Sequence, residues 1–188
     1  MKNKVILVGN SGVGKTSLIS AFIGDYYNEE HLPTVNVSYC INEVVNNFNK
    51  KVKLEIWDTA GQEKYQAITK NFYRGANVAL ICFDYGDDLS KNSINKWIDA
   101  VLKESNECIL YLVATKIDKL QDQIQLDNYL SDINERYEPI SKVFVTSAKI
   151  KINVNELFLS VADENIKLMP IPDNPIQTTE KKDKKECC

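Results

Sequence analysis

Residues 9–16, Gly-Asn-Ser-Gly-Val-Gly-Lys-Thr, constrain this chain more than any other segment. They follow an apolar run at residues 5–8, which reads as a buried strand, and precede residues 17–23, whose apolar side chains recur at helical spacing. The segment fits G-x-x-x-x-G-K-[ST], a glycine-rich loop between a strand and a helix. Such a loop turns N–H groups toward phosphate oxygens, and the helix dipole adds positive charge. The sequence therefore predicts a phosphate-binding loop.

The last two residues of this loop carry specific chemistry. We expect Lys15 to reach the β- and γ-phosphates of a nucleotide and the Thr16 hydroxyl to bind Mg²⁺. A chance match to the pattern in a chain of this length is roughly one in a hundred, and the strand–loop–helix context disfavours a plain glycine turn. The residues expected to contact the nucleotide here are Ser11, Gly12, Val13, Gly14, Lys15, Thr16 and Ser17.

The rest of the chain alternates between strand and helix patterns. Residues 37–45 and 52–57 flank a turn and predict an antiparallel hairpin. Further strands are expected at residues 76–83, 108–114 and 142–146, and helices at residues 92–103, 125–136 and 154–167. This alternation predicts an α/β fold, a mostly parallel sheet with helices on both faces. Ligands bind beyond the carboxyl ends of such strands, where Gly9, Asp58 and Thr115 stand.

Composition narrows the function classes. A formal net charge of −3 argues against nucleic acid as the main partner. No apolar run has the length of a membrane span or of a signal-peptide core, so we expect a cytosolic chain. Three of the five cysteines, at positions 40, 82 and 108, lie in apolar runs and are expected in the core. With one histidine and no CxxC pair, a zinc site is not expected.

A second motif follows the strand at residues 52–57. Asp58 stands at a strand end on the same sheet edge as the phosphate loop, so it is expected to hold Mg²⁺ through a water. In the string Trp-Asp-Thr-Ala-Gly-Gln-Glu at 57–63, Gly61 can bring its N–H near the γ-phosphate. Gln62 can orient the attacking water, which makes it the candidate catalytic residue.

Together these motifs resemble the Rab family of Ras-superfamily small GTPases, over residues 4–167 and at the C-terminal end. The resemblance includes Phe-Tyr-Arg-Gly-Ala at 72–76, Thr-Lys-Ile-Asp at 115–118 and Thr-Ser-Ala-Lys at 146–149. It implies a P-loop NTPase G domain at residues 1–168, with a six-stranded sheet that is parallel except for one antiparallel strand. It also implies GTP or GDP and Mg²⁺ as the bound groups.

The same resemblance assigns the guanine site. Asp118 accepts from guanine N1–H and the 2-amino group, a pattern that adenine lacks and the site would reject. The Ala148 N–H meets O6, and the stem of Lys116 lies along the base. The full set implied near the base is Tyr27, Thr115, Lys116, Asp118, Ser147, Ala148 and Lys149.

The resemblance also places switch and effector residues. Thr34 falls where the family's switch threonine binds Mg²⁺ and reports the γ-phosphate. The aromatic residues Tyr39, Trp57 and Phe72 fit positions that Rab effectors read.

Three departures stand out. Thr115 replaces the usual asparagine, Ser11 replaces the glycine of Ras, and the Val-Asn-Val-Ser-Tyr string at 35–39 lacks the usual glycine and acid. We expect guanine selectivity to survive and the effector surface to differ.

Residues 169–188 are rich in Pro, Lys and Glu and are expected to form a disordered tail. Residues 180–186 hold four lysines and three acids, so this segment is barely cationic and cannot serve as a strong polybasic membrane anchor. The terminal Cys187 and Cys188 resemble the Rab pattern for double geranylgeranylation, and two lipid chains anchor where one does so only marginally. The implied location is the cytosolic face of an endomembrane. The implied partners are an exchange factor, a GTPase-activating protein, effectors, a GDP-dissociation inhibitor and the prenylation machinery.

Two function classes remain open. The first is a switch in vesicle trafficking that hydrolyses GTP slowly, because the two arginines, Arg74 and Arg136, lie outside the phosphate motifs. The second is a GTP-loaded scaffold that hardly hydrolyses, which Gln62 disfavours. A small-molecule kinase is a third reading, but the chain lacks a long lid insert and an arginine cluster.

Overall fold

The computed structural model describes residues 1–24, 37–59, 71–120, 137 and 139–167. Its sheet contains six strands in the order β2-β3-β1-β4-β5-β6. The strands are β1 Lys2–Val8, β2 Ser38–Val45, β3 Lys51–Asp58, β4 Val78–Asp84, β5 Ile109–Thr115 and β6 Ile140–Val145. The helices are α1 Lys15–Ile23, α3 Asp88–Asn92, α4 Ile94–Glu104, η2 Ile117–Lys119 and α6 Val154–Lys167.

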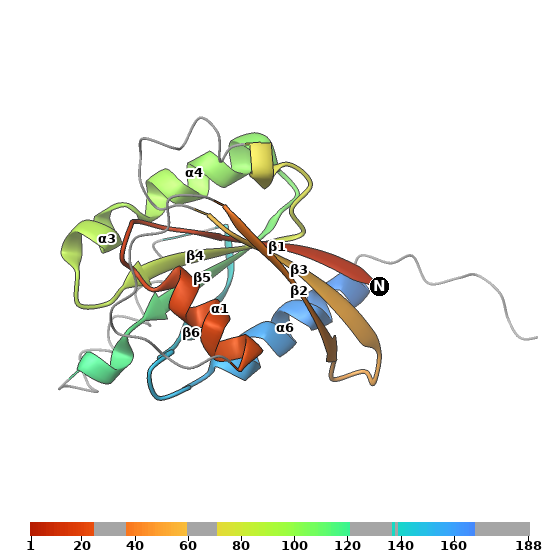
Figure 1. Cartoon of the computed structure of the whole chain (residues 1–188). Helices are drawn as coiled ribbons and strands as arrows, with labels where there is room; N and C mark the ends of the chain where they lie inside the picture. The colour runs from red at the N-terminus through yellow and green to blue at the C-terminus, as the bar shows by residue number, and fades with distance from the viewer. Residues whose placement is uncertain (25–36, 60–70, 121–136, 138, 168–188) are drawn as a thin grey trace, which may run out of the picture.

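The predicted α/β fold is confirmed. All neighbouring strands pair in parallel except β2 and β3, which form the expected hairpin. Figure 1 shows α3 and α4 on one side of the sheet and α1 and α6 on the other. The carboxyl ends of the five parallel strands therefore meet along one edge of the sheet, as the strand–helix alternation predicts.

Two layers of apolar side chains hold the helices to the sheet. One joins α1 and α6 to residues such as Leu7, Leu54 and Leu80, and the other joins α4 to residues such as Ile6 and Ile81. The core helix α4 buries side chains at helical spacing, namely Ile94, Trp97, Ile98 and Val101. The cysteines at positions 82 and 108 are buried as predicted, Cys40 is half-buried, and all three are free thiols. Burial raises the pKa of both buried thiols to about 12.

Several boundaries differ from the predicted ones. Strand β1 begins at Lys2, before its apolar run, because the main chain of residues 2–4 already pairs with β3. Helix α3 was not predicted, since its single buried residue is Ser90 and it has no apolar periodicity. The helix predicted at residues 125–136 and the tail predicted at residues 169–188 lie outside the described residues. Within the described part of the chain, no helix is long and apolar enough to cross a membrane.

Candidate functional site

The loop from Gly9 to Gly14 leaves β1 and delivers the chain to α1, as predicted. Gly9 has a φ of 146°, and a Cβ added there would overlap the main-chain oxygen of Cys82. Gly14, with a φ of 97°, lies directly before Lys15, where α1 begins. Glycine is required at Gly9 because any larger residue would displace the loop from β4. This close approach holds the loop against the carboxyl edge of the sheet.

Lys15 is the central side chain of this loop. It is 5 % exposed, and its Nζ donates to the main-chain oxygens of Gly9 and Asn10, both at 2.9 Å. No carboxylate of the described residues lies within ion-pair distance of it. Burial lowers the pKa of Lys15. A buried cation bonded to neutral carbonyls favours an anion as its further partner, and a phosphate in the loop would supply one.

Thr16 and Asp58 come from different elements and meet beside the loop. The Thr16 hydroxyl donates to Asp58 Oδ2 at 2.6 Å, and Asp58 is 2 % exposed at the end of β3. The next hydroxyl, that of Thr59, donates to the Leu7 oxygen at 2.6 Å and fixes this strand end to β1. A hydroxyl and a carboxylate are hard oxygen donors of the kind that Mg²⁺ prefers. This donor pair therefore fits a Mg²⁺ ion bound together with phosphate oxygens.

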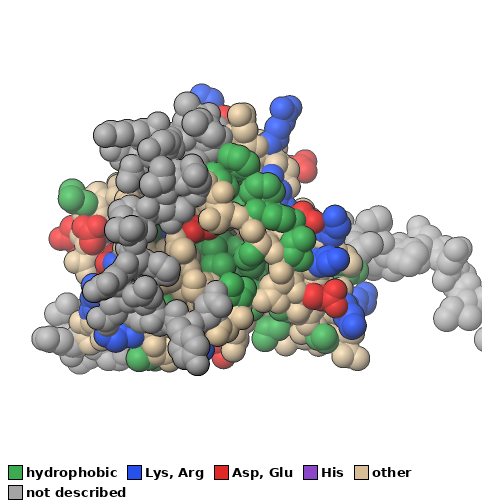
Figure 2. Space-filling model, viewed as in Figure 1, with side chains coloured by type: hydrophobic (Ala, Val, Ile, Leu, Met, Phe, Trp, Pro, Cys, Tyr) green, Lys and Arg blue, Asp and Glu red, His purple; other side chains and the backbone are tan. Residues whose placement is uncertain are grey.

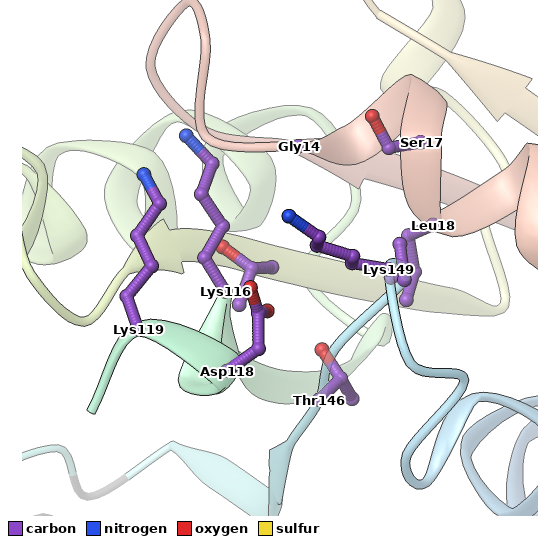
Figure 3. A pocket seen from close by; sticks show the side chains of 10 residues that line it. Gly14, Ser17, Leu18, Lys116, Asp118, Lys119, Thr146 and Lys149 are labelled. Atoms are coloured by element: carbon purple, nitrogen blue, oxygen red, sulfur yellow. The ribbon is translucent and has the colours of Figure 1, made fainter. Parts of the chain in front are cut away.

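A cavity of about 490 Å³ adjoins the loop at the ends of β5 and β6. Figure 3 shows Lys116 and Asp118 entering it from one side and Thr146 and Lys149 from the other. The Ser147 hydroxyl donates to Asp118 Oδ1 at 2.5 Å, which orients the carboxylate. The lining residues are Gly14, Ser17, Leu18, Thr115, Lys116, Asp118, Lys119, Thr146, Ala148 and Lys149. The cavity thus collects side chains predicted at the guanine site and residues of the phosphate loop.

Thr115 connects this cavity to the phosphate loop although it departs from the family's asparagine. Its Oγ1 lies 2.6 Å from the Val13 oxygen and 2.9 Å from the Phe83 oxygen. A hydroxyl has one hydrogen, so it donates to one of these carbonyls at a time. Its neighbour Lys116 has a φ of 59°. The Lys116 Nζ donates to the Gly12 oxygen at 2.6 Å. The two residues therefore tie the base cavity to the phosphate loop.

Sequence reasoning missed Asp84, whose Oδ2 lies 2.9 Å from the Lys116 Nζ in an ion pair. The signal was available, because Asp84 ends β4 at the same sheet edge where Asp58 ends β3. It also missed the side chain of Asn10, which the loop pattern leaves unspecified.

Other predicted residues fall into two groups. The aromatic rings of Tyr39, Trp57 and Phe72 are brought together, with centroids 4.6 Å apart for the first two and 5.3 Å for the last two. Tyr39 is 46 % exposed, and Figure 2 shows hydrophobic side chains gathered in the middle of the face that β2 borders. A second group lies outside the described residues, namely Tyr27, Thr34, Gly61, Gln62, Cys187 and Cys188.

The strand–loop–helix unit, the oxygen pair at Thr16 and the adjoining cavity define a P-loop nucleotide-binding protein of the α/β class. The family model for the Ras family matches residues 4–167. The chain is 34% identical over 169 residues to Ras-related protein Rab-10 of Diplobatis ommata, which covers 89% of this chain and 83% of that protein. It is also 34% identical over 184 residues to the GTP-binding protein YPT1 of Saccharomyces cerevisiae, covering 97% and 87%.

A third relative is Ras-related protein SEC4 of the same yeast, 36% identical over 160 residues, which cover 85% of this chain and 73% of that protein. The chain belongs to the Ras family and is a small GTPase of the Rab type. GTPases of the Rab type bind GTP and GDP together with Mg²⁺ and act in vesicle transport.

Proposed function

We propose that this chain is a GTP-operated switch that recruits effectors to the cytosolic face of an endomembrane and resets itself by slow hydrolysis of GTP. The observation that carries the proposal is the Asp118 carboxylate, held by Ser147 in a cavity that shares Gly14 with the phosphate loop. A carboxylate placed there accepts two adjacent N–H groups of guanine, whereas adenine lacks that donor pair and would cover the carboxylate without satisfying it. The site therefore favours guanine nucleotides.

The base assignment is tested by exchanging the hydrogen-bonding pattern. Asp118→Asn is expected to shift preference from GTP toward xanthosine triphosphate, measured by competition against a fluorescent nucleotide. Asp99→Asn is the matched control, because Asp99 is an exposed carboxylate on α4. Wild-type protein that bound ATP as well as GTP would contradict the base site.

The hydrolytic half of the proposal rests on Gln62 and on the absence of an arginine from the phosphate motifs. Phosphoryl transfer without a cation supplied to the transition state is slow, and an arginine supplied in trans accelerates it by roughly 10³–10⁵. We therefore expect a low intrinsic rate that a GTPase-activating protein stimulates. Single-turnover hydrolysis by wild type and Gln62→Leu without a partner is the test, and equal rates would favour the GTP-loaded scaffold.

The membrane and partner assignments come from the family and from the chain's own residues. The ring cluster Tyr39, Trp57 and Phe72 is the proposed effector-facing surface, with Thr34 as the γ-phosphate sensor on Mg²⁺. Geranylgeranyl groups on Cys187 and Cys188 would anchor the chain, and the same groups would engage the GDP-dissociation inhibitor. Deleting both cysteines is expected to release a fluorescent fusion from membranes without changing nucleotide affinity. Persistent membrane binding would reveal another anchor.

A further inference from the structure

Asn10, the second residue of the phosphate loop, is bonded to a helix that belongs to neither motif. Its Oδ1 accepts from Trp97 Nε1 at 2.9 Å, and its Nδ2 donates to Ser93 Oγ at 3.1 Å. Ser93 in turn donates to the Leu89 oxygen at 2.8 Å. An indole nitrogen only donates, so Trp97 dictates which end of the Asn10 amide faces it. Both ends of the amide are therefore fixed.

The helix that provides these contacts is firmly seated. Ser93 precedes the first turn of α4, and Trp97 lies one turn further on, on the same face of the helix. Trp97 is 3 % exposed and packs in the core layer with Ile98 and Val101. The bridge from Asn10 therefore ends on a rigid element.

The main chain of Asn10 accepts a hydrogen bond from Lys15, the lysine expected to bind phosphate. The Asn10 oxygen accepts from Lys15 Nζ at 2.9 Å, so the peptide group after Asn10 sets where the ammonium rests. Rotation of that peptide would move the carbonyl away from Lys15. Because the side chain of Asn10 is held at both ends, this rotation is opposed by two further hydrogen bonds.

We propose that Asn10, clamped by Trp97 and Ser93 of α4, is a positioning residue that holds the Lys15 ammonium in its phosphate-binding place and so slows nucleotide release. The proposal rests on the proposed function, since it concerns the same nucleotide. It assigns a role in nucleotide release to a residue that the loop pattern leaves unspecified. Loss of the clamp would loosen the contact with the phosphates of GDP and GTP alike.

The test uses the full chain loaded with Mg²⁺ and a fluorescent GDP analogue, whose release is followed after excess GDP is added. Trp97→Phe keeps the buried ring and removes only the N–H donor. Release is expected to accelerate about 3–10-fold, the effect of one hydrogen bond. Ser93→Ala, which leaves the core intact, is expected to act in the same direction and serves if Trp97→Phe does not fold.

Two comparisons separate positioning from general loosening. Tyr111→Phe also deletes one donor, the hydroxyl that bonds Glu164 Oε1 at 2.8 Å far from the loop, and is expected to leave release unchanged. In a double-mutant cycle, Asn10→Ala combined with Trp97→Phe is expected to release nucleotide no faster than Asn10→Ala alone, because both remove the same contact.

Unchanged release in Trp97→Phe, or equal acceleration in Tyr111→Phe, would overturn the positioning role. Additive effects of Asn10→Ala and Trp97→Phe would overturn it as well. Wild-type protein that fails to bind the GDP analogue would instead contradict the proposed function.

Discussion

Two lysines, Lys15 at the start of α1 and Lys142 on β6, show how differently this molecule treats a positive charge. Lys15 is bonded to main-chain oxygens, and burial lowers its pKa. Lys142 on β6 lies 2.8 Å from Glu164 Oε1 and donates to Ser160 Oγ at 2.7 Å. Burial alone lowers the pKa of Lys142, but its hydrogen bonds to Glu164 and Tyr111 outweigh burial and raise it.

This difference distinguishes Lys15, which serves ligand binding, from Lys142, which stabilises the fold. Glu164 is 3 % exposed on α6 and also accepts from the Tyr111 hydroxyl, so the charge of Lys142 is neutralised within the chain. Such an ion pair joins α6 to the sheet whether or not nucleotide is present. Lys15 has only neutral acceptors among the described residues, so its charge is best satisfied when a phosphate arrives. We expect changes at the two lysines to act on different measurements.

The largest expected effect is at Lys15. Lys15→Met removes charge-assisted hydrogen bonds to phosphate and should weaken GDP binding roughly 100-fold. The stability of the nucleotide-free protein should stay the same or rise, because a buried cation is replaced by an apolar chain. Fluorescent nucleotide titration and urea unfolding measure the two quantities. An unchanged GDP affinity would contradict the assignment of Lys15 as a phosphate-binding residue.

Lys142→Met should do the reverse. It removes the ion pair that Lys142 makes with the buried Glu164 carboxylate, so the free energy of unfolding should fall by about 2 kcal/mol, less than for a fully buried pair because Lys142 is partly exposed. GDP affinity should match wild type when measured well below the unfolding midpoint. If nucleotide binding weakened as much as in Lys15→Met, the two lysines would not be separable.

Tyr111→Phe tests how much the Tyr111 hydroxyl adds to the stability that the Lys142–Glu164 ion pair provides. The hydroxyl lies 2.8 Å from Glu164 Oε1, and its removal should lower the free energy of unfolding by about 1 kcal/mol. Urea midpoints of Tyr111→Phe, Lys142→Met and the double variant measure the coupling. Strictly additive changes would mean that the tyrosine and the lysine stabilise α6 independently.

The smallest expected effect is on the pH dependence of stability. The pKa of Lys15 lies below its ordinary value of 10.5, so the unfolded chain binds this proton more tightly and stability should rise with pH below 10.5. The pKa of Lys142 lies above 10.5, so its stabilisation is present below 10.5 and is lost as pH rises through the folded-state value.

The slope of the free energy of unfolding against pH, measured on the nucleotide-free protein, should therefore change in opposite ways in the two variants. Lys15→Met should flatten the rise below 10.5, and Lys142→Met should flatten the decline above it. One proton changes the slope by at most about 1.4 kcal/mol per pH unit. Identical slopes in both variants would contradict the opposite pKa directions.

Much of the fold could be predicted because its signals are local. The glycines of the phosphate loop and the apolar runs of β1 and β5 are contiguous in sequence, and they located the strands to within a few residues. Helix α3 was missed because its start depends on Asp87, whose side chain accepts from the Leu89 N–H, and not on apolar spacing.

The site divides in the same way. Lys15, Thr16 and Asp58 follow from motifs, since each stands at a fixed offset from a strand end. The Asn10–Trp97 bridge spans 87 residues and depends on how α4 lies over the loop, which no local pattern encodes. Trp97 also fits the apolar spacing of α4, so the sequence presents it as a core residue and gives no sign that its ring nitrogen donates a hydrogen bond.

The start of β1 has a practical consequence for labelling. The Met1 oxygen already accepts from the Lys53 N–H at 2.9 Å, and Figure 1 places the N-terminus at the end of β1 opposite the phosphate loop. A fluorophore attached at Met1 has no unpaired stretch of chain between itself and the sheet, so it tumbles with the whole domain. Its fluorescence anisotropy would therefore report the mass of whatever particle the domain joins, without touching the nucleotide.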